Sequence, residues 1–294
     1  MLARCLASLA TQRVDNSLPV SIVVVDNEIE PSARPGVEAF ASASPFPVHY
    51  VHQPRRGIAA ARNAALDKAM ALGVDWVAML DDDETAAPDW LAQLMHPDYL
   101  AVPVLMGSNR LVYPDPLPFW FVVKEEKGQE GARLKTAYTG NVRFSACLPR
   151  AGLRFQERLG LMGGEDNEFF AQAHAMGFEI RRTLRACTYE VAHPERLTYR
   201  AQIYRAYWCA ASELRRLSIT RGRAGALLRK GHTVPLNLIF GGVWLLGAAL
   251  AAPLSRTRYR DMALEGGKKL AKGAGRLAAL LGHKPQPYRI VHGS

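Results

Sequence analysis

The chain has 294 residues, of which 49% are hydrophobic and 22% are charged. This is the composition of a folded globular protein, and it excludes fibrous and largely disordered chains. Residues 1–195 contain 19 basic and 24 acidic residues, whereas residues 196–294 contain 18 basic and 3 acidic residues. The second region is strongly basic, and we expect its partner to be anionic, either nucleic acid or a membrane surface.

The first hundred residues are predicted to alternate between helices and strands. Leu2, Leu6 and Leu9 have helical spacing, and the β-branched run from Ile22 to Val25 is typical of a strand buried on both faces. The segments "PVHYVHQP" and "DWVAML" predict two further strands, with an alanine-rich helix between them. This alternation predicts a doubly wound α/β sheet, in which ligands bind at the carboxyl ends of the strands.

Four consecutive acidic residues, Asp81 to Glu84, end the third predicted strand. Alternate side chains of an extended segment point the same way, so Asp81 and Asp83 can share one Mg²⁺ or Mn²⁺ that also binds diphosphate oxygens. Such a cation would offset the mutual repulsion of the carboxylates in this D-x-D motif. The alternative is an acidic turn that caps the next helix.

A second acidic pair, Glu165 and Asp166, follows two glycines in "GGEDNEF" and opens a predicted helix. Glycines before a helix allow a ligand to approach closely, and a carboxylate placed there can act as general base on a hydroxyl group. The alternative is that the two acids only favour the dipole of the helix.

Five segments occur in the order and approximate spacing of the family 2 glycosyltransferases of the GT-A fold: "VVVDNE", "GIAAARNAAL", "AMLDDDETAAPDWL", "TGNVRF" and "GGEDNEFF". Over about residues 1–200 the chain resembles this family, and most of all its bacterial succinoglycan or exopolysaccharide subgroup. The resemblance implies a mixed sheet flanked by helices in a catalytic domain of residues 1–195. It also implies inverting transfer of a sugar from a nucleotide donor, with Mn²⁺ or Mg²⁺ stabilising the departing diphosphate.

The resemblance further implies a role for individual residues. Asp26 would accept a hydrogen bond from the nucleotide base, typically uracil, and Asp166 would be the general base, with Glu165 as its rival. Asp81 would contact the ribose or the metal, and Asp83 would bind the metal. The residues implied in binding of the nucleotide sugar are Asp26, Arg62, Asn63, Asp81, Asp82 and Asn141, with Thr139 and Gly140 near the transferred sugar. His193 is either a further metal ligand, as in some GT-A enzymes, or structural.

Members of this family usually open with a strand and a "P-T-x-R"-like turn before the helix that begins this chain. That strand lies in the middle of the sheet, and its turn contacts the nucleotide. The resemblance therefore implies either a start upstream of residue 1 or the loss of this strand, which would leave neighbouring strands without partners.

Residues 234–254 form a charge-free run of 21 residues, and about 20 apolar residues can cross a bilayer. Basic residues flank the run on both sides, and the positive-inside rule disfavours moving the second cluster across. A membrane span, an in-plane or re-entrant segment and a buried hairpin all stay open. With the resemblance, the basic helical region 196–294 predicts membrane association at the cytoplasmic face of the bacterial inner membrane, where the acceptor is a lipid-linked glycan or a polysaccharide.

Three alternatives compete with this function. A sugar-phosphate nucleotidyltransferase uses a similar sheet and metal, but the chain lacks its Gly-rich loop near an N-terminal strand. A nucleic-acid-binding protein is disfavoured because the basic residues flank an apolar run and do not alternate with aromatic residues, so we expect no nucleic-acid partner. An inactive, truncated scaffold is favoured by the missing strand and disfavoured by the intact acids.

Overall fold

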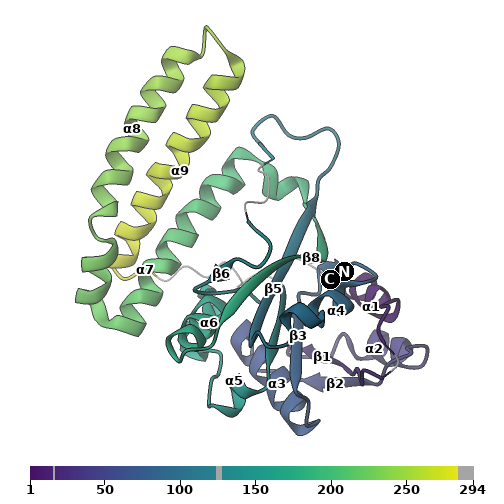
Figure 1. Cartoon of the computed structure of the whole chain (residues 1–294). Coiled ribbons are helices and arrows are strands. Elements are labelled where there is room, and N and C mark those ends of the chain that lie inside the picture. Colours follow the sequence, from purple (N-terminus) through teal and green to yellow (C-terminus); the bar gives the residue numbers. More distant parts are fainter. Residues whose placement is uncertain (16, 124–127, 284–294) are drawn as a thin grey trace.

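A computed structural model describes residues 1–15, 17–123 and 128–283 (Figure 1). The first elements are α1 (Leu2–Ala10), β1 (Ile22–Asp26), α2 (Arg34–Ala41), β2 (Val48–His52), α3 (Ile58–Ala71), β3 (Trp76–Leu80), β4 (Glu84–Ala86) and α4 (Trp90–Leu94). They are followed by η1 (Pro97–Tyr99), β5 (Val104–Val112), β6 (Arg133–Leu134), β7 (Asn141–Ser145), α5 (Cys147–Arg150), η2 (Glu157–Met162), α6 (Glu165–Ala175), β8 (Ile180–Val191) and η3 (Pro194–Leu197). Three long helices complete the described chain: α7 (Tyr199–Lys230), α8 (Thr233–Ala251) and α9 (Arg256–Leu280). The predicted α/β class with a helical C-terminal region is confirmed.

The strands form two sheets. β1 and β2 make a parallel pair, while β3, β7, β5, β8 and β4 lie in this order in a second sheet, with β6 also pairing with β8. In the second sheet β5 and β8 are parallel, whereas β7 is antiparallel to both of its neighbours. The mixed sheet is therefore confirmed, but the single doubly wound sheet expected from the alternation of elements is wrong.

The two sheets are separated by a cavity of about 2070 Å³. Val23 and Val25 of β1 and Val77 and Met79 of β3 line it. The Ile22 amide donates to Pro47 on the side of β2, so the amides of Val23 and Val25 point away from β2. Among the described residues no strand pairs with this edge of β1 or with the corresponding edge of β3. Because no hydrogen bonds join β1 to β3 here, the strands form two sheets.

A cluster of buried aromatic side chains fixes α6 on the second sheet. Phe169 and Phe170 of α6 pack against Phe144 of β7, and Phe169 stacks on Phe155 with ring centroids 4.3 Å apart. All four side chains are at most 2% exposed, and burying each one contributes about 1.5–3 kcal/mol. The start of α6, with its acidic pair, is thereby held in a fixed position relative to the sheet.

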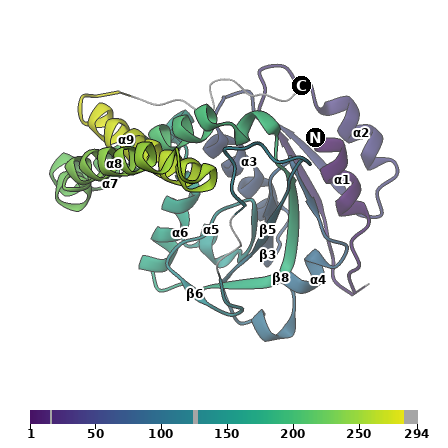
Figure 2. The same ribbon diagram turned by 90° about the horizontal axis from the view of Figure 1, so that it is seen from above.

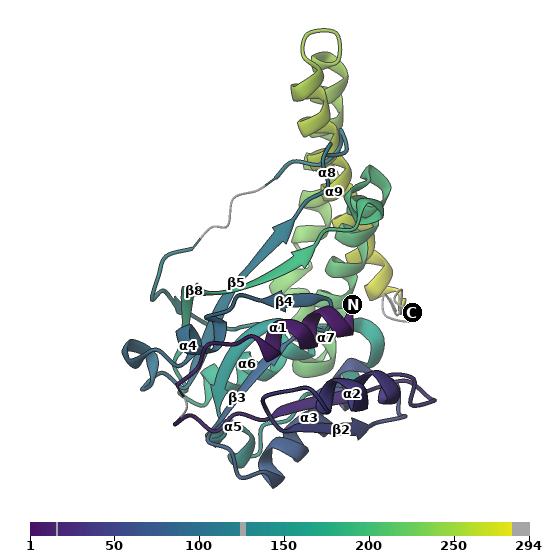
Figure 3. The same cartoon turned by 90° about the vertical axis from the view of Figure 1, so that its right-hand side faces the viewer.

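The C-terminal helices lie on the side of the sheets opposite α1 and α2 (Figure 2). α7 is tied to α6 by the ion pair between Arg216 and Glu168, whose atoms are 2.8 Å apart. Within α7 the helix breaks at Gly222, whose φ of 75° favours glycine. α8 and α9 form a hairpin that extends away from the sheets (Figure 3). Among the described helices, α8 is long and apolar enough to cross a bilayer.

Candidate active site

Arg62 joins the two acidic segments that the sequence analysis singled out. It lies on α3, which begins after Gly57, a residue with the glycine-favouring φ of 136°. The Arg62 guanidinium pairs with Glu165 through Nη1 and with Asp81 through Nη2, the latter at 3.4 Å. Its side chain is only 12% exposed. The end of β3 and the start of α6, which are distant in the sequence, therefore meet at one buried cation.

The acids after β3 lie at the rim of the large cavity. Asp81, Asp82 and Asp83 all line it, and Asp82 is the exposed member. Partial burial and the neighbouring Asp83 raise the pKa of Asp81, while Arg62 opposes this shift. Crowded carboxylates that repel one another are a donor set suited to a hard divalent cation.

The donor set fits such a cation only in part. Among the described residues, no group of three His, Cys, Asp or Glu side chains is placed to hold a metal ion. A cation shared by Asp81 and Asp83 therefore needs further oxygen ligands from water or a substrate. Mg²⁺ and Mn²⁺ accept such mixed coordination, typically from one or two carboxylates and phosphate oxygens.

Glu84 is a site residue whose importance the sequence analysis missed. It opens β4, is 3% exposed, and accepts a hydrogen bond from Asn109. Burial and the nearby Asp81 raise its pKa to about 8. Across the β4–β8 ladder it faces Glu190. The pKa of Glu190 is also raised, by burial and by the nearby Asp83. The acidic cluster is thus larger than the D-x-D motif, and no pattern in the local sequence indicated that Glu84 and Glu190 would meet.

The acidic pair of α6 has two distinct environments. Gly163 and Gly164, with φ of 78° and 88°, lead into the helix. Glu165 is 3% exposed, and burial raises its pKa although Arg62 opposes this. Asp166 is only half-buried, and its Oδ1 accepts the Asn167 amide at 2.6 Å. Of the two carboxylates, Asp166 is the one that an acceptor can approach from solvent.

Asp26 ends β1 at the same cavity. Its carboxylate accepts hydrogen bonds from the amides of Ala33 and Glu28 and from the Tyr50 hydroxyl, at 2.8–3.1 Å. Burial acts to raise the pKa of Asp26, but these hydrogen bonds outweigh it and hold the pKa below its ordinary value. Asp26 is therefore an ionised carboxylate held by its own loop, and its contact with a nucleotide base stays a prediction.

The next residue, Asn27, was not singled out from the sequence. Its amide donates to the carbonyl groups of Gln53 and Arg55 and accepts from the Gly57 amide. It therefore ties the end of β1 to the start of α3, and so helps to fix the position of Arg62.

Two predicted binding residues make internal contacts instead. Asn141 is fully buried, and its amide bonds the Trp90 indole and the carbonyl groups of Ser108 and Ala186. Asn63 bonds both backbone polar groups of Phe155. Their roles in donor binding stay predictions, and the contacts that they make hold the fold together.

The chain is similar to known proteins. A family model for glycosyl transferase family 2 matches residues 1–145. The succinoglycan biosynthesis protein ExoM of Rhizobium meliloti (strain 1021) is 32% identical over 298 residues, covering 96% of this chain and 90% of that protein. The chain belongs to glycosyltransferase family 2. The predicted family and its glycosyltransferase activity are confirmed, which favours sugar transfer over nucleotidyl transfer.

Solved structures show the same fold. The crystal structure of S. aureus TarS 1-349 in complex with UDP matches with a TM-score of 0.52 and 17% identity, covering 99% of this chain and 90% of that one. A second crystal structure of S. aureus TarS 1-349 matches with a TM-score of 0.52 and 16% identity, covering 96% and 88%. The glycosyltransferase thus has the GT-A fold.

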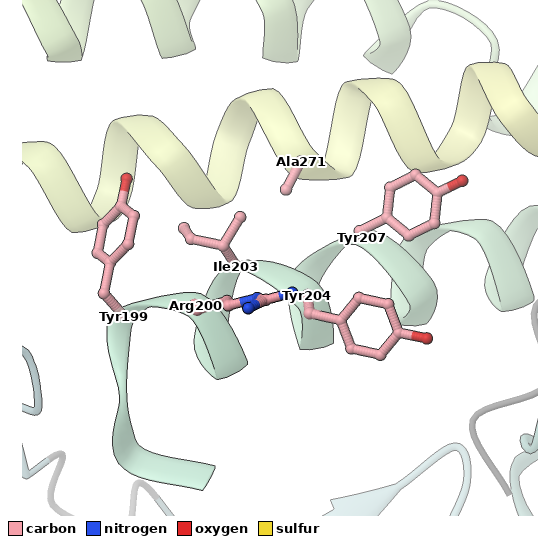
Figure 4. A pocket seen from close by; sticks show the side chains of 6 residues that line it. All are labelled: Tyr199, Arg200, Ile203, Tyr204, Tyr207 and Ala271. Carbon is pink, nitrogen blue, oxygen red and sulfur yellow. The ribbon is translucent and has the colours of Figure 1, made fainter. Parts of the chain in front are cut away.

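Two further features of the glycosyltransferase lie apart from the carboxylates. His193 is exposed and precedes η3, and the described structure gives it no contact with Asp81 or Asp83. A second cavity of about 550 Å³ lies between α7 and α9 and is lined by Tyr199, Tyr207 and Ala271 among others (Figure 4). It contains none of the predicted site residues.

Gly140 provides a test of the acidic cluster. A methyl group on this residue would lie 2.7 Å from Glu84 Oε1 and 3.3 Å from Asp81 Oδ2. We expect Gly140→Ala to displace Asp81 and to weaken UDP binding in the presence of Mn²⁺ about tenfold or more, because overpacking costs about 1–3 kcal/mol. Calorimetric titration measures this effect. Gly36→Ala, whose methyl group meets nothing within 4 Å, is the control, and equal affinity of both variants would contradict the prediction.

Proposed function

We propose that this enzyme is an inverting, metal-dependent glycosyltransferase that moves a sugar from a UDP-sugar to a lipid-linked or polysaccharide acceptor in the synthesis of exopolysaccharide or another cell-envelope glycan. The observation that carries the proposal is the Arg62 bridge, which brings the carboxylate of Asp81 and the start of α6 to one site. A donor site and a base for the acceptor are the two parts that direct sugar transfer requires. The similarity to ExoM, a succinoglycan biosynthesis protein, supports the type of product.

The donor would lie along the large cavity, between Asp26 and the acids after β3. Asp26 is an ionised acceptor for the N–H group of a uracil base. Asp81 and Asp83 would hold Mn²⁺ or Mg²⁺, which when bound neutralises the charge that develops on the departing diphosphate. The structure of S. aureus TarS in complex with UDP supports a UDP donor for this fold.

The acceptor would approach Asp166 from solvent. The hydroxyl oxygen of the acceptor forms a bond to the anomeric carbon of the donor sugar, on the face opposite UDP. At the same time the bond from that carbon to the diphosphate oxygen breaks. Asp166 takes the hydroxyl proton, and UDP leaves with the electron pair of the broken bond. Attack from the opposite face inverts the anomeric configuration. Glu165 is less suited to take the proton because it is buried against Arg62.

We also propose that the two regions of the chain have different functions. Residues 1–195 would carry catalysis, and residues 196–294 would attach the enzyme to the cytoplasmic face of the inner membrane. The basic charge of the second region and the apolar helix α8 support this location. An acceptor anchored in an anionic membrane would be concentrated there.

Titration of UDP into the purified protein, with and without Mn²⁺, tests the donor site. We expect Mn²⁺ to strengthen binding in the wild type, and Asp83→Ala to remove about 10–100-fold of affinity in the presence of Mn²⁺, as loss of a group that supports a metal does. Asp89→Ala is the control, because Asp89 is exposed at the start of α4, outside the lining of the large cavity. Unchanged Mn²⁺-dependent binding by Asp83→Ala would overturn the metal assignment, and absence of UDP binding in the wild type would overturn the proposed donor.

A further inference from the structure

The outer face of α8 carries a continuous apolar stripe. Its side chains recur every three or four residues, which places them on one side of the helix, and each is more than a third exposed. The stripe consists of Leu236, Ile239, Phe240, Val243, Leu246 and Leu250. The stripe runs from Leu236 to Leu250, about 21 Å along α8, and soluble monomers rarely leave such an apolar surface uncovered.

The opposite face of α8 is covered by α9 along its whole length. A methyl group on Gly273 would lie 2.8 Å from Leu238, near the start of α8, and one on Gly241 would lie 2.7 Å from Leu270. Nearer the end of α8, a methyl group on Gly266 would lie 3.0 Å from the Leu245 side chain. The two helices therefore form a closely packed antiparallel unit (Figures 1 and 3).

This packing decides between a span and an in-plane segment. α9 carries charged residues along its length, and Lys268 and Lys269 lie beside the middle of α8, next to the Gly241–Leu270 contact. If α8 crossed a bilayer with the hairpin intact, it would carry these lysines to the bilayer centre. Each lysine there costs about 2.5–3.5 kcal/mol. The closed hairpin therefore disfavours a span.

The charged residues at the ends of α8 indicate what covers the stripe. Exposed basic residues stand at both ends of α8, with Arg229 before it and Arg256 and Arg258 after it. A second copy docked on the stripe, in either direction, would bring these like charges together. The headgroups of an anionic membrane would pair with the basic residues while the acyl chains receive the stripe.

We propose that the α8–α9 hairpin lies flat on an anionic membrane, with the stripe of α8 immersed in one leaflet and α9 on the side facing away from the lipid. This deepens the proposed membrane location and rests on it for the acceptor. The contacts that support this proposal lie within α8 and α9. Because lipid binding is measured separately from UDP binding, failure of this proposal can be told apart from failure of the proposed donor.

Flotation of the full chain with vesicles of phosphatidylcholine, with or without phosphatidylglycerol, tests the proposal. We expect binding to the phosphatidylglycerol vesicles, and at least a tenfold loss in the double variant Leu246→Glu with Leu250→Glu. The control is Leu100→Glu with Met176→Glu, two exposed apolar residues of the catalytic body, which should bind vesicles as the wild type does. All variants should retain the UDP affinity of the wild type.

Topology is measured with Thr257→Cys, at the exposed start of α9, in a background where Cys147 and Cys209 are serine. An impermeant maleimide added outside the vesicles should label this cysteine fully. Protection of the cysteine would show that α8 spans the bilayer. Equal flotation of the double variant and the wild type would remove the stripe as the lipid contact. Self-association without flotation, abolished in the double variant, would assign the stripe to a second copy. Each of these three results overturns the proposal.

Discussion

Asp166→Asn is expected to lower the rate of sugar transfer about 10²–10⁴-fold while UDP binding stays at the level of the wild type. The reason is geometric. Asp166 is half-buried, so an acceptor can reach it from solvent, whereas Glu165 is buried and paired with Arg62. The change removes the proton acceptor but keeps the size of the side chain and its contact with Asn167. The donor site, which lies on the other side of Arg62, should be unaffected.

Two measurements check this expectation. UDP release from UDP-sugars in the presence of a membrane lipid extract reports transfer, and calorimetry reports UDP binding. Asp89→Asn, an exposed aspartate at the start of α4, should leave both unchanged. Transfer that survives in Asp166→Asn would assign proton removal to Glu165 or another group. Loss of UDP binding in the same variant would place Asp166 in the donor site instead.

The parts of the site that lie within one local motif were predictable from the sequence. Asp81 and Asp83 follow an apolar strand, and the glycines before Glu165 announce a helix start, so each position follows from neighbouring residues. The contact between these segments was not predictable from periodicity, because Arg62 comes from a third element. Family resemblance placed Arg62 beside the nucleotide but gave no indication that it pairs with Glu165.

Other contacts that were not predictable from the sequence also depend on tertiary structure. Glu84 and Glu190 face each other across the β4–β8 ladder, and only strand register brings them together. The amide of Asn141 satisfies buried carbonyl groups of β5 and β8, a requirement that the local sequence does not reveal; its predicted role near the sugar stays a prediction. The division of the sheet was also hidden, since alternating elements specify strands but not which edges pair.

The packing and exposure of α8 bear on how residues 234–254 relate to a membrane. The sequence left a span, an in-plane segment and a buried hairpin open for residues 234–254. The exposure of the α8 stripe argues against the buried hairpin, because Leu246 and Leu250 are 69% and 76% exposed. The close packing of α9 argues against the span. Neither property can be read from hydropathy, which describes each helix separately.

Removing the Arg62 guanidinium is expected to have the largest effect on stability. Arg62→Met leaves the Glu165 carboxylate buried without its cation, and Glu165 Oε2 already lacks a partner among the described residues. Breaking a buried ion pair from one side costs about 3–5 kcal/mol of unfolding free energy. Because protonation neutralises Glu165, and burial raises its pKa, the deficit should be full at a pH above that raised pKa and shrink as the pH falls below it.

Urea unfolding of a double-mutant cycle measures this coupling. Arg62→Met combined with Glu165→Leu removes both charges, so it should recover most of the stability lost in Arg62→Met. UDP binding should stay impaired in the double variant, because Asp81 has lost its neighbouring cation. The control is Arg55→Met, since Arg55 pairs with Glu157 at 2.9 Å but its side chain is 65% exposed. An exposed pair contributes about 0–1 kcal/mol. If Arg62→Met cost no more than Arg55→Met, or if the two changes at Arg62 and Glu165 were additive, Arg62 would not be the stabilising buried connection between Asp81 and Glu165 that we infer.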